Sequence, residues 1–128
     1  MNRIGYVAIV AIAALPIATG ALAQDRREVV PEMNVLLEND CVRVQDHDVA
    51  VGGKIPVHSH PNYVVYTLEP FAARITLADG STRIGKHGAG EAYWNEPITH
   101  AVENTGKAGI HNLIIELKPG ASCHEERR

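Results

Sequence analysis

The stretch Gly52-Gly53-Lys54-Ile55-Pro56-Val57-His58-Ser59-His60-Pro61 carries the most informative pattern in the chain. It begins with a glycine pair typical of a turn, continues as a short run of strand-like character, and ends at a proline. Because residues two apart in a strand project from the same face, the pattern predicts that His58 and His60 point in the same direction. Two imidazoles on one face can bind one metal ion through nitrogen, at about 2.0–2.2 Å. A solvent-facing pair on an edge strand is the alternative.

Short apolar runs separated by Gly, Pro, Asn and Asp continue over most of the chain. After residue 23, no window of about 12 residues keeps a helical apolar period without Gly or Pro. Asp79-Gly80 lies between two apolar runs and predicts a tight two-residue hairpin. The predicted strands are 41–51, 54–58, 63–68, 73–77, 81–84, 91–94, 100–104 and 111–117.

This series of short strands predicts an all-β fold, either a sandwich or a barrel. A sheet in so small a domain must close or stack to bury a core and to protect its edges. We therefore expect a compact single-domain β-barrel of jelly-roll type over residues 34–118, in which residues 34–40 form only a short lead-in. An exposed arm is expected at 24–33 and a charged tail at 119–128.

The N-terminal segment has the three parts of a secretory signal peptide. Arg3 provides a basic start, residues 4–18 are almost wholly apolar, and Ala21-Leu22-Ala23 is a small-x-small cleavage signature. The apolar run is shorter than the roughly 20 residues of a membrane span, and Pro16 interrupts it. We expect a signal peptide at 1–23 and a periplasmic or secreted mature protein. An uncleaved membrane anchor is the alternative.

Export would place the two cysteines, Cys41 and Cys123, in an oxidising compartment. Their spacing matches neither a zinc ribbon nor a Cys-x-x-Cys redox motif. A disulfide between them would close a loop of about 80 residues and stabilise the fold by a few kcal/mol. Two unpaired thiols are the alternative.

The charge balance gives no indication of a nucleic-acid partner. The chain has 12 basic and 15 acidic side chains, a net charge of −3, and no basic block. Once the signal peptide is removed, no membrane partner is expected either. The 7 histidines are a high count for a chain of this size, and histidine is a frequent metal ligand.

Two segments match the motifs of a known family. Gly52, five residues and then His58-Ser59-His60 match its first motif. Pro97-Ile98-Thr99-His100 followed by Ala101-Val102-Glu103-Asn104 matches the histidine and asparagine spacing of its second motif, which Gly90-Glu91-Ala92-Tyr93-Trp94 introduces. Over about residues 34–117 the chain resembles a small single-domain cupin of the RmlC-like jelly-roll superfamily.

The chain departs from the family pattern at two places. Val64 and Val65 stand where cupins place a ligand Glu after the His-x-His motif, and a Gly expected shortly before His100 is missing. The resemblance therefore implies a three-His metal site of His58, His60 and His100, as in the thiol-dioxygenase branch of the cupins. Neutral imidazoles leave the charge of a divalent ion uncompensated, so an open coordination position would favour an anionic ligand or hydroxide.

Other side chains are weaker candidates for this site. Glu69 could replace the missing Glu only after a register break, and Pro70 directly after it indicates that the strand ends there. Tyr66 and Trp94 are candidates for shaping a pocket, and His111 for a hydrogen bond to a ligand histidine. The other histidines are expected in exposed segments: His47, His87 and His124.

The resemblance implies an exported cupin that binds one divalent transition metal, which could be Fe, Mn, Ni, Cu or Zn. Its enzymatic form would be a dioxygenase acting on a small anionic or enolizable molecule. The alternative is a non-catalytic periplasmic module that binds a small ligand or a metal, and the missing Glu favours that alternative. The resemblance also implies a homodimer. Glu69, Glu91 and Glu103 could serve as acids or bases, but no pattern selects one of them.

Overall fold

The computed structural model describes residues 33–120 and 123. The expected signal peptide at 1–23, most of the expected arm, and residues 121–122 and 124–128 lie outside the described residues. Among the described residues, no helix is long and apolar enough to cross a membrane. The strands are β1 (Met33–Glu38), β2 (Val42–Val49), β3 (Lys54–His60), β4 (Tyr63–Thr67), β5 (Phe71–Leu77), β6 (Thr82–His87), β7 (Ala92–Asn95), β8 (Ile98–Asn104) and β9 (Ile110–Leu117).

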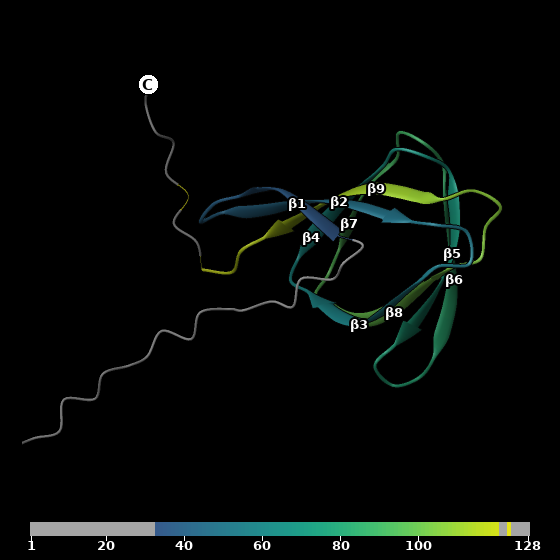
Figure 1. Cartoon of the computed structure of the whole chain (residues 1–128). Coiled ribbons are helices and arrows are strands. Elements are labelled where there is room, and N and C mark those ends of the chain that lie inside the picture. Colours follow the sequence, from purple (N-terminus) through teal and green to yellow (C-terminus); the bar gives the residue numbers. More distant parts are fainter. Residues whose placement is uncertain (1–32, 121–122, 124–128) are drawn as a thin grey trace, which may run out of the picture.

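These strands form two sheets that face each other (Figure 1). One sheet has the order β1-β2-β9-β4-β7 and the other the order β3-β8-β5-β6. All neighbouring strands are antiparallel, and the chain changes sheet at every connection except β1 to β2 and β5 to β6. The expected all-β jelly roll is therefore confirmed.

The core lies between the two sheets, because alternate side chains of each strand point inward. In β9, Ile110 and Ile114 are buried, whereas Leu113 and Ile115 between and beyond them are only half-buried. Burial of one such side chain stabilises the fold by about 1.5–3 kcal/mol. The buried apolar residues are Met33, Val49, Ile55, Tyr63, Val65, Ala73, Val102, Ile110 and Ile114.

Strand β1 differs from the lead-in that the sequence pattern predicts. Met33 belongs to this strand and is buried in the core, whereas the other residues of β1 are exposed. The pairing of β1 with β2 shifts register between Val35 and Leu37, which is the mark of a β-bulge. An exposed edge strand with a bulge has no period-two apolar pattern, and this is why the sequence does not indicate it.

The hairpin predicted at Asp79-Gly80 joins β5 to β6. Its loop spans three residues, 78–80, and not the two that the sequence predicts. Across the turn, the Leu77 N–H donates to the Ser81 carbonyl oxygen at 2.8 Å. Gly80 has a φ of 82°, a left-handed conformation that glycine adopts without strain. Asp79 Oδ1 accepts a hydrogen bond from the Ser81 N–H at 2.9 Å, which closes the turn.

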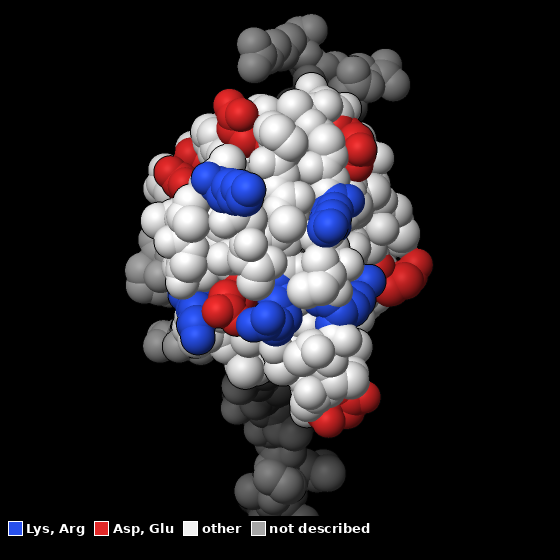
Figure 2. Space-filling model, turned by 90° about the vertical axis from the view of Figure 1, so that its right-hand side faces the viewer, with Lys and Arg blue, Asp and Glu red and all other residues white. Residues whose placement is uncertain are grey.

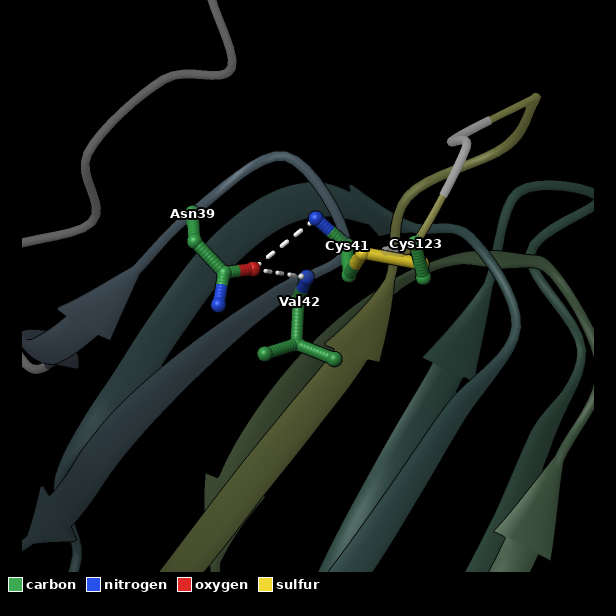
Figure 3. The surroundings of a disulfide bond; sticks show 4 residues. All are labelled: Asn39, Cys41, Val42 and Cys123. Carbon is green, nitrogen blue, oxygen red and sulfur yellow. Dashed lines mark hydrogen bonds between the residues drawn. A yellow bond between two sulfur atoms is a disulfide. The ribbon is translucent and has the colours of Figure 1, made fainter. Parts of the chain in front are cut away.

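A disulfide joins Cys41, at the start of β2, to Cys123 (Figure 3). The two Cα atoms are 5.5 Å apart, within the usual range for a disulfide. Beside it, Asn39 Oδ1 accepts hydrogen bonds from the N–H groups of Cys41 at 2.8 Å and Val42 at 2.9 Å. The Lys118 N–H also donates to the Cys41 carbonyl oxygen at 2.8 Å. The bond and these contacts hold the end of β9 and the residues after it against the β1–β2 turn.

Mixed charges cover the face that lies at the right of Figure 1. On this face the basic side chains are interspersed with acidic ones (Figure 2). Glu103 of β8 pairs with Arg74 at 2.7 Å and with Lys54 at 3.6 Å on the outer surface of the β3-β8-β5-β6 sheet. Exposed pairs of this kind contribute at most about 1 kcal/mol each.

Replacement of Cys41 and Cys123 by serine together should lower the free energy of unfolding by about 2–4 kcal/mol, because the disulfide closes a long loop that the unfolded chain otherwise opens. Denaturant unfolding of both proteins, with and without reductant, measures the effect. Reductant should destabilise only the wild-type protein. A wild-type protein whose mass and unfolding midpoint do not respond to reductant would contradict the disulfide.

Candidate metal centre

The structure brings His58, His60 and His100 together inside the barrel. His58 lies directly opposite His100 across the β3–β8 pair, and His60 follows two residues later in β3. All three are buried, and their ligand nitrogens lie within 4.8 Å of one another. Two bonds of about 2.1 Å to one ion span up to about 4 Å, so small rotations of the rings suffice to bring these nitrogens onto one ion.

A β-bulge in β3 turns His58 inward. The pairing with β8 shifts register between Ile55 and His58, and Pro56 and Val57 are both exposed between these two buried residues. In a regular strand, residues three apart such as Ile55 and His58 would face opposite sides of the sheet, and the bulge brings both to the inner side. Pro56 suits this position because it has no N–H to donate to the ladder.

Hydrogen bonds select the tautomer of two of the three rings. His58 Nδ1 lies 2.8 Å from the Pro56 carbonyl oxygen, which can only accept, so this nitrogen carries the proton. His60 Nδ1 lies 2.7 Å from Glu116 Oε1 and donates to it in the same way. In both rings Nε2 keeps its lone pair, which is the form that a metal-ligating imidazole takes. The donor set therefore fits a divalent transition metal.

Glu116 is the acidic residue that supports this centre. It lies on β9, is 2% exposed, and holds His60 from the side opposite Nε2. Its second oxygen, Oε2, lies 3.9 Å from Arg43 Nη1, which helps to offset the cost of burying a carboxylate. Strand parity could have identified Glu116 from the sequence, since it continues the alternate inward positions of Ile110, Asn112 and Ile114.

Burial also determines the charge of two histidines. Removal from water, together with the nearby charges of His58 and His60, lowers the pKa of His100 to about 3. The same causes lower the pKa of His47 to about 4. Both rings are therefore neutral at physiological pH, which keeps their nitrogens available as acceptors.

The prediction that His47 is exposed is wrong. The structure buries it, with 5% of its surface exposed, on the inner face of β2 between Gln45 and Val49. Asp46 and Asp48 on either side of it point outward, so their polarity says nothing about the position between them.

The three histidines face a cavity of about 200 Å³ between the sheets, lined by Met33, His47, His58, His60, Tyr63, Val65, Phe71, Ala73, Ile75, Arg83, Gly85, His87, Tyr93, Asn95, His100, Val102, Ile110, Asn112 and Ile114. This volume lies below the roughly 300–1,000 Å³ of drug-sized pockets. Burial raises the pKa of Tyr63 and of Tyr93 to about 12, and the positive charge of Arg83 acts against that rise. Within the described part of the chain, Arg83 has no carboxylate at ion-pair distance.

Tyr66 and Trp94 do not line the cavity, so the prediction that they shape a pocket is wrong. They are 40% and 52% exposed on the outer face of the sheet. Tyr63 and Val65 are the inward residues of β4, so Tyr66 must face outward. In β7 the inward residues are Tyr93 and Asn95, and Trp94 between them points away.

His111 and Glu69 also lie outside the cavity. His111 Nε2 is 2.9 Å from Asp46 Oδ1 on the outer face, because the inward positions of β9 belong to its neighbours. Glu69 is exposed beyond the end of β4, as the proline after it indicates, and it does not take the place of the missing cupin Glu. His87, expected in an exposed turn, is half-buried at the end of β6 and stacks on Tyr93 with ring centroids 4.0 Å apart. His124 lies outside the described residues.

Solved structures confirm the fold. A cupin domain from Bordetella pertussis Tohama I is 24% identical with a TM-score of 0.62, and the match covers 67% of this chain and 91% of that one. A protein with a double-stranded β-helix domain from Klebsiella pneumoniae is 21% identical with a TM-score of 0.56, over 75% of this chain and 85% of that one. The polyketide cyclase RemF from Streptomyces resistomycificus is 20% identical with a TM-score of 0.53, over 79% of this chain and 78% of that one.

No protein-family model and no curated protein matches the chain. At these identities the likeness to solved structures concerns the fold alone. The protein has the cupin fold, with three histidines gathered at its centre.

The metal-free protein should lose stability as the pH falls below about 6.5. The pKa of His47 is about 4 and that of His100 about 3 in the folded protein, against an ordinary value of 6.5. Between these values the unfolded chain binds protons that the folded chain does not, so stability present above pH 6.5 is lost as the pH falls toward the folded values. Urea midpoints measured from about pH 7 to about pH 5 should therefore decrease. His47→Leu should make this dependence shallower and His111→Ala should not, whereas a midpoint unchanged over the interval would contradict the burial of neutral rings.

Proposed function

We propose that this protein is an exported cupin that binds one divalent transition metal through His58, His60 and His100. The observation that supports this most is the clustering of three buried imidazoles: each offers one nitrogen within 4.8 Å of the others, and hydrogen bonds at Nδ1 leave Nε2 of His58 and His60 as the ligand atom. Three buried imidazoles without an ion would repel one another on protonation, so a bound cation gives the cluster a physical reason. The metal is one of Fe, Mn, Ni, Cu and Zn, since imidazole suits each of them.

A small anion is the ligand that the charges of the cavity favour. A divalent ion on three neutral nitrogens keeps its full charge, and Arg83 adds a further positive charge to the cavity wall. When bound, the metal would supply a Lewis-acid or redox centre with open positions for the ligand. In the enzymatic form of the proposal, a dioxygenase would act on a small anionic or enolizable molecule, and Arg83 would orient its anionic group.

Binding without turnover is the second candidate, and one observation favours it. Among the described residues, the cavity lining contains no carboxylate that could act as a general base. Glu91 is exposed and bonded to His87, Glu103 pairs with Arg74 on the outer surface, and Glu69 is exposed. Oxygen consumption with small thiols and enediols as substrates separates the two candidates.

Export is part of the proposal. A cleaved signal peptide at 1–23 would deliver the chain to the periplasm or outside the cell. The disulfide between Cys41 and Cys123 supports this proposal, since such bonds persist in oxidising compartments.

The alanine variants of the three histidines test the metal site. His58→Ala or His100→Ala should lower the bound metal per chain at least tenfold, while circular dichroism and unfolding of the metal-free variants stay close to those of the metal-free wild type, because neither ring fills the apolar core. Elemental analysis of untagged protein reloaded with iron, manganese and zinc gives the readout. His111→Ala is the matched control and should keep full metal content, since this histidine faces outward. Equal metal content in all variants, or none in a folded wild type, would rule the site out.

A homodimer is also proposed, and the outer face of the five-stranded sheet supports it. One row of paired residues crosses all five strands of this face and is apolar throughout: Leu37, Val44, Ile115, Val64 and Trp94. Leu37 is 49% exposed and Trp94 52%. A second copy turned about a two-fold axis would place the same row against this one, as isologous dimers do.

Trp94→Arg should shift the protein from dimer to monomer, because it places a charge in the apolar row. Light scattering after size-exclusion chromatography measures the mass. Val57→Arg is the control, since Val57 is as exposed but lies on the other sheet. A wild type that is monomeric at high micromolar concentration would refute the dimer.

A further inference from the structure

Two polar side chains lie next to each other on the cavity wall that the five-stranded sheet forms. His47 of β2 and Asn112 of β9 are directly opposite one another in the register. Both point inward, both line the cavity, and they are 5% and 3% exposed. They come from strands of the five-stranded sheet, whereas the three-His cluster is on the facing sheet, so the pair and the cluster line different walls of one cavity.

The protein leaves polar atoms of both side chains unpaired. Among the described residues, both ring nitrogens of His47 and Oδ1 of Asn112 have no hydrogen-bond partner. Buried polar atoms are nearly always paired in native proteins, and an unpaired one destabilises the fold. Two such residues side by side on a cavity wall therefore indicate a partner that enters from the cavity.

Asn104 shows what a structural asparagine of this fold does instead. It is 2% exposed, points inward, and lies outside the cavity lining. Its Nδ2 donates to the carbonyl oxygens of Val49 at 3.0 Å and Ala108 at 2.9 Å, and its Oδ1 accepts from the Gly106 N–H at 2.9 Å. Every polar atom of this side chain has a partner within the protein. Asn112 has the same burial without those partners, which sets it apart from a structural residue.

We infer that His47 and Asn112 form a hydrogen-bonding subsite for an uncharged oxygen of the ligand, and that the ligand is a small hydroxy- or oxo-carboxylate. This inference rests on the proposed function for the anionic end, which Arg83 and the metal centre would hold. A neutral imidazole offers one donor and one acceptor, and a side-chain amide offers both as well. A hydroxyl group, which donates once and accepts twice, can therefore bond to both residues at the same time.

The size of the cavity limits the ligand. The cavity of about 200 Å³ is smaller than the roughly 300–1,000 Å³ of drug-sized pockets, which favours a small acid of a few carbons. The apolar remainder of the wall, which includes Val65 and Ile114, would contact its carbon chain.

The binding test compares three-carbon acids that differ in one oxygen. Zinc-loaded wild-type protein is titrated calorimetrically with propanoate, 2-hydroxypropanoate and 2-oxopropanoate. We expect either oxygenated acid to bind more tightly than propanoate, and His47→Leu to reduce that preference about five- to tenfold. Any chelation of zinc by the extra oxygen is the same in both proteins, so it cancels when their preferences are compared.

Gln45→Leu is the matched control for this comparison. Gln45 lies on β2 two residues before His47, faces inward and is 5% exposed, but it does not line the cavity. Its replacement should leave the preference unchanged. A preference unchanged in His47→Leu, or reduced equally in both variants, would overturn the subsite.

Stability without metal or ligand gives a readout that does not depend on the choice of acid. Because His47 has no partner to lose, His47→Leu should keep or raise the urea midpoint of the apo protein at about pH 7, while it weakens binding. A structural histidine would show the reverse, with a lower midpoint and an unchanged preference, and that result would refute the inference. If the wild type holds one zinc per chain but binds none of the acids, the subsite fails and the metal site stands. If it holds no zinc, the proposed function fails first.

Discussion

The structure depends on the burial of four imidazole rings between two sheets that offer them little water. Desolvation favours the neutral form of His47 and His100, and the charges of His58 and His60 act in the same direction, so the pKa of His47 and of His100 lies far below the ordinary value. Neutral rings can lie close together, and their nitrogens remain available to a metal or a ligand. The same arrangement becomes costly as the rings gain protons. The chemistry of the site and the acid sensitivity of the fold therefore have one cause.

Half of the buried residues between the sheets are polar. Among the described residues, nine buried side chains are apolar and nine are polar or charged. Some of the polar residues are satisfied within the protein, such as Asn104, whose side chain bonds to three backbone groups. Others face the cavity without partners. A small core that is half polar buries little apolar surface and so contributes little stabilisation. The disulfide and the backbone hydrogen bonds of the two sheets compensate for this.

Period-two patterns and turn residues predicted most of the fold. The jelly roll, the β5–β6 hairpin and the convergence of the three histidines followed from them together with the resemblance to cupins. Strand β1 did not, because an exposed edge strand with a bulge has no alternation to detect. His47 was missed because its two aspartate neighbours gave the segment a polar character, although alternate residues of a strand face opposite sides. Residue type alone suggests Tyr66 and Trp94 for the pocket. The alternation of inward and outward residues along a strand, which can be read from the sequence, places both outside it.

The carboxylate of Glu116 lies in a different place from the ligand Glu of the cupin pattern. The family pattern places a carboxylate on the metal, whereas Val65 occupies the inner face of β4 here and the carboxylate lies behind His60. From there it cannot cancel the charge of the ion directly. By accepting a hydrogen bond from the His60 Nδ1–H it fixes the ring orientation and would make His60 a more basic ligand. A metal bound by the three histidines alone would keep one more coordination position open than the family pattern leaves. An exogenous anion could take that position, and the positive charge of Arg83 on the cavity wall would favour it.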